Sequence, residues 1–238
     1  MPRWLKKRRK SEKKIHPDLN WINITPQEGH YLFGYYDRNP FSIENRFHLA
    51  LKVPHDGRLP LQGETAEVGV IDIAEREFIR ITSTEAWCHQ QGAMTQWIPG
   101  KKDRFIFNDA IPRTLAGKTK INEGWKLISR VHDVNGNHVR DMDFPIYIIS
   151  HNGRWGITLD FSRIPRRGYS YARAPLPSGE PLPNIDRDGV FLVNLDTGEK
   201  KLVLSYRQVL EAPDGPVQQE HPDELDERRF YHWMNHAS

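Results

Sequence analysis

One stretch of the sequence, Trp87 to Asp109, reads WCHQQGAMTQWIPGKKDRFIFND and gathers side chains that can do chemistry. It holds the only cysteine of the chain, Cys88, directly before His89. Histidine exchanges protons near neutral pH, and amides hydrogen-bond polar ligands. The amides and carboxylate of interest are Gln90, Gln91, Gln96, Asn108 and Asp109. We therefore ask which elements hold these side chains and which other segments they meet.

Composition places the chain among folded, β-rich proteins. Its 238 residues suffice for one large domain, and 37% hydrophobic with 27% charged residues disfavour disorder. Much of the net charge of +3 lies in MPRWLKKRRKSEKK, residues 1–14, which we interpret as a solvated start and not as a nucleic-acid site. This run lacks the apolar segment of a secretory signal, and no stretch is apolar enough to span a membrane. We expect a cytoplasmic location and no membrane span.

Three segments share one pattern of strand, turn, basic residue and strand. They are Tyr31 to Val53, Gly92 to Asp109 and Pro145 to Ser162. Their turns contain Asn-Pro, Pro-Gly or Asn-Gly, and the basic residues are Arg46, Arg104 and Arg154. Short apolar or alternating runs between such turns are typical of strands.

A second hairpin follows each of these segments. The turns are predicted at Ala74–Arg76, at Asn135-Gly136 and at Thr197-Gly198. Asn-Gly and Thr-Gly-Glu between alternating runs indicate hairpins. Two hairpins make four strands per unit. The best helical candidate is short, from Tyr206 to Gly215, and Pro213 is expected to end it.

Repeated units of two hairpins predict an all-β fold, a β-propeller of four-stranded antiparallel blades. We expect residues 29–238 to form this domain and residues 1–28 to be a basic, flexible lead-in. The insertion Ile164 to Gly189 predicts a long surface loop. Phe230 to Ser238 reads as the first strand of a fourth unit. Because about three blades and a stub leave open edges, we expect a fragment of a longer propeller or closure by a partner chain.

In a propeller the first strand of each blade lines a central channel, so polar residues at the strand entries converge on one end. The candidates at this channel mouth are His30, Tyr35, Tyr36, Asp37, His89, Gln90, Gln91, Asn108, Asp109, Tyr147, Asp160, Arg163, His232, Asn235 and His236. Each has a structural alternative, since a histidine or tyrosine can pack in the core and an aspartate can close a turn. We expect Gln96 to face outward along its strand and Cys88 to be a small buried residue.

Four motifs occur together in the chain: GHYLFGYYDRNPF, WCHQQGAMTQW…FND, FPIYIISHNGRWGITLDFSR…GYSY and HWMNHAS. Together they resemble a family of seven-bladed β-propeller proteins that includes the short ulvan lyases and is distantly similar to oligogalacturonate lyase. The resemblance spans residues 29–238. In such relatives further blades follow the NHxS strand. The resemblance implies β-elimination on a uronic-acid polysaccharide.

That reaction removes the C5 proton beside the uronate carboxylate and expels the 4-linked sugar, so it needs a cation, a base and an acid. By the resemblance, Tyr147 is the base or acid, and Arg163 neutralises the carboxylate. His89 lies near the first of two catalytic histidines of that family. The second is expected where this chain has Asn108 and Asp109, and an asparagine takes no proton. We expect substrate contacts from Gln91, Asn108, Tyr36 and His236.

The resemblance also suggests a divalent metal, since His and Gln side chains hold one in oligogalacturonate lyase. The matching set here is His89, Gln91, His232 and His236, and imidazole and amide oxygen suit manganese or a similar ion. Nothing else in the sequence calls for a cofactor.

Two functions stay open. The first is a polysaccharide lyase-like propeller that acts on acidic glycans, and the pair Tyr147 and Arg163 favours it. The second is a non-catalytic carbohydrate-binding or scaffolding propeller associated with cell-surface polysaccharide production. The missing second histidine and the missing secretory signal favour this alternative. Under both, the expected partner is an acidic polysaccharide or oligosaccharide.

Overall fold

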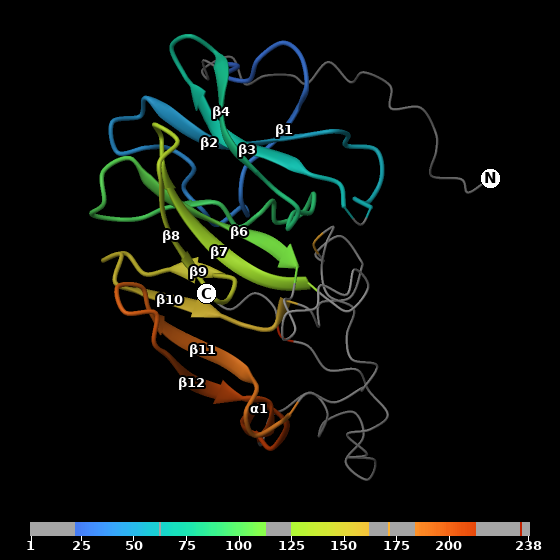
Figure 1. Ribbon diagram of the computed structural model, residues 1–238, viewed down its shortest axis with the longest axis vertical. Coiled ribbons are helices and arrows are strands. Elements are labelled where there is room, and N and C mark those ends of the chain that lie inside the picture. The colour runs from blue at the N-terminus through green and yellow to red at the C-terminus, as the bar shows by residue number, and fades with distance from the viewer. Residues whose placement is uncertain are drawn as a thin grey trace, which may run out of the picture.

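The structure, a computed structural model, describes residues 22–61, 63–112, 125–161 and 184–212, together with residues 171 and 234. Within this part of the chain it contains three four-stranded antiparallel sheets and one short helix. Figure 1 shows the three sheets following one another along the long axis of the molecule. The expected all-β class and its four-stranded antiparallel units are therefore confirmed.

Within every sheet the strands lie in chain order, with antiparallel neighbours. The first sheet contains β1 (His30–Leu32), β2 (Phe47–Val53), β3 (Ala66–Asp72) and β4 (Glu77–Thr84). The second contains β5 (Gln96–Trp97), β6 (Arg104–Pro112), β7 (Trp125–Asp133) and β8 (His138–Met142). The third contains β9 (Ile148–Ile149), β10 (Trp155–Thr158), β11 (Gly189–Asn194) and β12 (Lys200–Ser205).

The turns between the outer strands lie where the sequence predicted them. The β7–β8 turn contains Asn135 and Gly136, and Gly136 has a φ of 89°, a left-handed conformation that favours glycine. The β3–β4 and β11–β12 hairpins likewise enclose the segments 74–76 and 197–198. Local turn chemistry therefore defines where these outer hairpins reverse.

The one helix of the described residues, α1 (Tyr206–Leu210), continues directly from β12. The Ser205 side chain accepts a hydrogen bond from the Gln208 backbone N–H, and the Gln208 side chain bonds back to the Ser205 backbone. This capping box satisfies two N–H groups that the first turn leaves without partners. The helix lies within the predicted segment but ends at Leu210, before Pro213. No helix in the described ranges has the length and apolarity required to cross a membrane.

The second sheet is buried on both faces. Phe105 and Phe107 of β6 pack with Leu51 of the first sheet, whereas Ile106 between them packs with Val193 of the third sheet. All of these side chains are at most 1% exposed. A strand covered on both sides reads as a continuous apolar run, as the letters FIF of β6 do.

A third apolar group, which we call the central cluster, joins the segments next to the three inner strands β1, β5 and β9. Its buried members are Tyr35, Ala86, Cys88, Met94, Ala110, Leu127, Tyr147, Leu159, Phe161 and Tyr171. Packed apolar side chains thus lie beside the inner strands, where we expected a polar channel mouth. The expected burial of Cys88 is confirmed, and this burial raises the pKa of its thiol to about 12.

His132 of β7 is a buried histidine of the second sheet. Its ring centroid lies 5.5 Å from that of Phe107 and 5.3 Å from that of His138. Burial disfavours the charged imidazolium and lowers the pKa of His132 below 6.5, and the nearby His138 and Arg130 lower it further. Asp141 and Asp133 oppose this shift.

We predict that the free energy of unfolding falls as the pH is lowered through the ordinary histidine range. The unfolded chain binds a proton on His132 near its ordinary pKa of 6.5, while the folded chain does so only at lower pH. This contribution is therefore present above that pH and is lost below it. Urea unfolding at about pH 7.5 and about pH 5.5 measures the loss. His132→Gln should weaken the dependence, whereas His151→Gln, in an exposed turn, should preserve it. Equal slopes for His132→Gln and the unchanged chain would contradict this assignment.

Candidate functional site

Two side-chain amides of the second sheet hold the backbone that leads into the third. Asn108 of β6 donates from Nδ2 to the Ile146 carbonyl at 3.0 Å, and its Oδ1 accepts from the Ile146 N–H at 2.8 Å. Gln96 of β5 donates from Nε2 to the Tyr147 carbonyl at 3.1 Å, and its Oε1 accepts from the Ile149 N–H at 3.1 Å. Each amide pairs with the backbone as a neighbouring strand would. We call Asn108 and Gln96 the amide clamp.

The amide clamp has little capacity left for a ligand. Asn108 also donates to the Tyr171 hydroxyl at 2.8 Å and accepts from the Ser129 hydroxyl at 3.1 Å, which completes its four hydrogen bonds. Its side chain is buried, and Gln96 is only 5% exposed and also donates to the Met94 carbonyl. The expectation that Gln96 faces outward is therefore wrong, because its amide serves the junction between two sheets.

Tyr147 lies at the centre of this junction. Tyr147 is 0% exposed and belongs to the central cluster. Its ring packs against Phe161 with the ring centroids 5.9 Å apart. Its carbonyl accepts hydrogen bonds from Gln96 and from Nη2 of Arg38, the latter at 3.2 Å. The Arg38 guanidinium carbon also lies 5.5 Å from the centre of the Tyr147 ring. Tyr147 thus joins all three sheets through backbone and ring.

The structure brings some of the predicted site residues together and separates others. Asn108 and Tyr147 approach each other through Tyr171, which stacks on Phe161 at 5.1 Å. Gln91 is also fully buried, whereas Tyr36 is 74% exposed. Two further predicted residues, Arg163 and His236, lie outside the described residues.

His89 belongs to a different group of side chains. Its ring packs against Trp87 at 5.2 Å and against His55 at 5.5 Å. Its Nε2 lies 2.8 Å from the His55 carbonyl oxygen. A carbonyl only accepts, so Nε2 is the donor of this contact.

Asp109, at the position expected for a second catalytic histidine, makes contacts that hold the strands together. Oδ1 of Asp109 accepts from the Thr84 hydroxyl at 3.0 Å and from the Glu85 N–H at 3.1 Å. Its Oδ2 pairs with Nε of Arg130 at 2.7 Å. With Asn108 in the amide clamp, both residues at this position hold strands together.

The expected metal set is only half described. His89 and Gln91 belong to the described residues, while His232 and His236 lie outside them. In the described part of the chain, no group of three or more His, Cys, Asp or Glu side chains is placed to hold a metal ion. The metal stays an expectation from the resemblance, and no step below depends on it.

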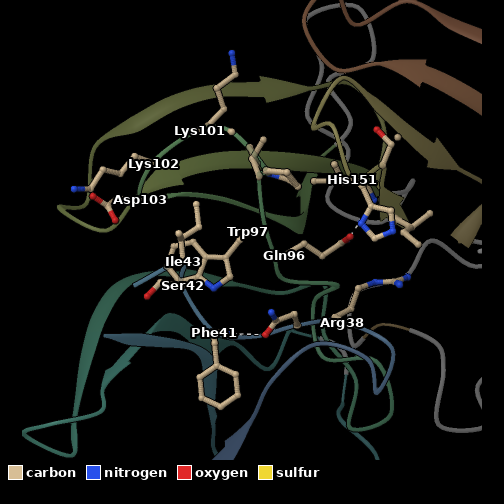
Figure 2. Close-up of a pocket in the computed structure, with 18 of the residues that line it drawn as sticks. Arg38, Phe41, Ser42, Ile43, Gln96, Trp97, Lys101, Lys102, Asp103 and His151 are labelled. Carbon is tan, nitrogen blue, oxygen red and sulfur yellow. Dashed lines mark hydrogen bonds between the residues drawn. The ribbon is translucent and has the colours of Figure 1, made fainter. Parts of the chain in front are cut away.

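An open groove lies at the turns of the inner strands. It has a volume of about 930 Å³ and is lined by residues 96–103, by most of the segments 37–47 and 148–157, and by Leu192. We call it the inner-strand groove. Phe41, Ile43 and Trp155 in its lining are 40%, 83% and 37% exposed. Figure 2 shows Trp97 and Ile43 between an end with Lys102 and Asp103 and an end with Arg38, Gln96 and His151.

Close backbone contact joins the turns of the second and third sheets beside this groove. Gly153, in the β9–β10 turn, has a φ of 67°, and a Cβ there would lie 2.2 Å from the Pro99 carbonyl oxygen. Only glycine allows the turns of the second and third sheets to approach so closely. The turns therefore form one continuous surface.

The charged side chains of the groove differ in their exposure. Three cations are paired: Arg38 with Asp37 at 2.7 Å, Arg46 with Asp72 at 3.3 Å and Lys102 with Glu44 at 3.3 Å. Lys101 has no ion pair to another described residue. The Arg46 and Lys102 side chains are 64% and 73% exposed, but that of Arg38 is only 6% exposed. Burial lowers the pKa of Arg38 from its ordinary value, and Asp37 opposes this shift.

The groove was not predicted from the sequence, because the predicted site residues lie at the opposite end of the inner hairpins. β2 begins at Phe47 in the groove and ends at Val53, two residues before His55, which contacts His89. The sequence does carry a signal for the groove. Apolar residues such as Ile43 and Trp155 stand in or beside turns of the sequence, where polar residues are the rule, and the structure shows both side chains exposed.

Comparisons of the chain with protein-family models, curated proteins and solved structures found no match. The resemblance to the lyase family therefore depends on the quoted motifs alone. The function must be argued from the geometry of the described residues.

We predict that Asn108→Leu lowers the free energy of unfolding by about 3 kcal/mol, because it leaves the buried N–H and carbonyl of Ile146 without partners. Chemical denaturation monitored by tryptophan fluorescence measures the change. Gln90→Leu, at an exposed position of the same segment, is the matched control and should change stability little. Unchanged stability of Asn108→Leu, combined with lost glycan binding, would restore the substrate-binding role expected from the sequence.

Proposed function

We propose that the chain is part of a β-propeller that binds uronic-acid-containing glycans in the inner-strand groove without cleaving them. The single observation that carries this proposal is the groove itself, which is open, lined with aromatic side chains and bordered by cations. Its volume of about 930 Å³ lies within the roughly 300–1,000 Å³ typical of ligand sites.

The lining of the groove suits a sugar chain. Sugars present apolar C–H faces and a rim of hydroxyl groups, so they pack on aromatic rings and hydrogen-bond at the edges. Phe41, Trp97 and Trp155 provide the rings, and Ser150 and His151 provide polar edges. The acidic class of sugar is supported by the resemblance and by the cations Arg38 and Lys101.

The topology supports the propeller. In each sheet the chain passes from an inner to an outer strand, and it then returns to the inner strand of the next sheet. The central cluster joins the inner segments of all three sheets. A closed ring needs blades or a partner chain beyond the twelve strands described. Exposed apolar residues of the third sheet that lie outside the groove, such as Val203 and Leu204, are suited to such a contact.

Binding without cleavage is favoured by the burial of Tyr147, the residue expected to act as base or acid. Tyr147 is 0% exposed, and a uronate C5 proton cannot reach its hydroxyl without rearrangement of the central cluster. Asn108 and Asp109 are both occupied by bonds between strands. The side chains of Tyr147, Asn108 and Asp109 therefore stabilise the packing of the sheets.

β-Elimination is the second candidate, and the contact between Nε2 of His89 and the His55 carbonyl is the observation that favours it. In the neutral ring, donation from Nε2 leaves the Nδ1 lone pair to accept the C5 proton. The C4–oxygen bond then breaks, a C4–C5 double bond forms, and an acid protonates the departing oxygen. The two candidates differ in whether an unsaturated product forms.

We predict that Trp155→Ala weakens binding of an oligouronate roughly tenfold, equivalent to about 1.4 kcal/mol, because it removes an aromatic face of the groove. Isothermal titration calorimetry on the full chain measures the affinity. Ile79→Ala, which truncates an exposed apolar side chain of β4 outside the groove, is the control and should bind as the unchanged chain does. Equal affinity for Trp155→Ala would remove the groove from the proposal.

We predict that incubation of the full chain with uronate polymers produces no rise in ultraviolet absorbance from unsaturated sugars. Binding of the same polymer, measured in parallel, shows that the protein in the assay is able to bind its ligand. If absorbance rises and Tyr147→Phe abolishes the rise, the binding-only proposal is wrong and the lyase candidate is supported. A rise that Tyr147→Phe leaves intact would point to His89 in place of Tyr147.

A further inference from the structure

Among the described residues, Arg38 is a buried cation of the groove that uses only part of its hydrogen-bonding capacity. The Arg38 side chain lines the groove yet is only 6% exposed. A guanidinium has five N–H donors, and among the described residues Arg38 uses one toward Asp37 and one toward the Tyr147 carbonyl. Its Nε is buried and has no hydrogen-bond partner in the described part of the chain. Buried donors without partners are rare in proteins and call for an explanation such as a bound ligand.

Arg38 is also held in place before any ligand arrives. Its guanidinium lies against the Tyr147 ring, and its bond to the Tyr147 carbonyl ties it to the amide clamp, since Gln96 donates to the same oxygen. A preorganised donor loses little conformational entropy on binding. Arginine is suited to this task because its planar fork matches the two oxygens of a carboxylate.

We propose that Arg38 is the residue of the inner-strand groove that recognises a uronate carboxylate. The inference rests on the proposed function, since it assigns the charge specificity of the same groove. The carboxylate lies at the end of the groove formed by Arg38, Gln96 and His151, with the sugar ring extending toward Trp97 (Figure 2).

The other cations of the groove are poorer candidates for this role. Arg46, Lys101 and Lys102 are exposed, and Arg46 and Lys102 are already paired with carboxylates of the chain. Charges that face solvent are screened by water and salt, so their contribution to specificity is small. Arg38 acts from a desolvated position, where a charge-assisted hydrogen bond is stronger.

Asp37 limits the affinity of this site. Its carboxylate lies 2.7 Å from Nη1 of Arg38 and is 29% exposed, so it places a negative charge beside the bound carboxylate. Removal of that charge should strengthen binding of a uronate and should leave a neutral sugar unaffected. If Arg38 had only a structural role, loss of its ion pair with Asp37 would not increase affinity for the uronate. An increase therefore indicates charge recognition.

The test compares two ligands of equal length on the full chain by calorimetry: a β-1,4-linked oligoglucuronate and the matching cello-oligosaccharide, in which each carboxylate is replaced by CH₂OH. The unchanged chain should prefer the oligoglucuronate about tenfold or more. Arg38→Met should abolish this preference while the neutral ligand still binds. Arg46→Met, which removes an exposed arginine of the same groove, is the matched control and should retain most of the preference.

Asp37→Asn gives a second, independent result, because it keeps Arg38 and tests the site even if Arg38→Met does not fold. We expect it to increase affinity for the oligoglucuronate several-fold and to leave the cello-oligosaccharide unchanged. The assignment of Arg38 is overturned if Arg38→Met keeps the preference or if Asp37→Asn weakens binding of the charged ligand. Failure of both ligands to bind the unchanged chain would instead overturn the proposed function.

Discussion

The pairing of side-chain amides with backbone is the interaction on which the rest of this structure depends. Strands within a sheet satisfy one another, but the inner edge of each sheet leaves N–H and carbonyl groups without a ladder partner. Between the second and third sheets, Asn108 and Gln96 satisfy four such groups on residues 146–149. A buried amide with all its bonds made fixes distance and angle more tightly than apolar packing, because hydrogen bonds are directional. The amide clamp therefore sets how the third sheet stands against the second.

That placement has consequences at both ends of the inner strands. At one end it draws Tyr147 into the central cluster, so that its ring supports packing and its carbonyl receives Gln96 and Arg38. At the other end it brings the turns of the second and third sheets into contact at Gly153, beside the groove. The residues that resemble a lyase site and the residues that form the groove are thus linked by the same hydrogen bonds. This link explains how the residues of the quoted motifs can be buried while the open surface lies elsewhere.

Much of the architecture could be predicted from the sequence because hairpins are local. The turn residues Asn135 and Gly136, and the alternation of strands such as β2, act over a few neighbouring residues and need no distant partner. The fate of the polar residues could not be predicted in the same way. An amide such as Gln96 reads as solvent-facing by type, but its partners Tyr147 and Ile149 stand about fifty residues away in the chain. Sequence separation hides the partner that makes burial favourable.

The amino-acid sequence by itself determined the all-β class, the order of the hairpins and the burial of Cys88, because turn chemistry and apolar periodicity are short-range properties. Only the tertiary structure decided which polar groups meet solvent. It buried Asn108 and Tyr147 and opened the groove around Arg38, since exposure depends on how whole sheets pack against one another. Each of these outcomes requires contacts between sheets that no single segment encodes.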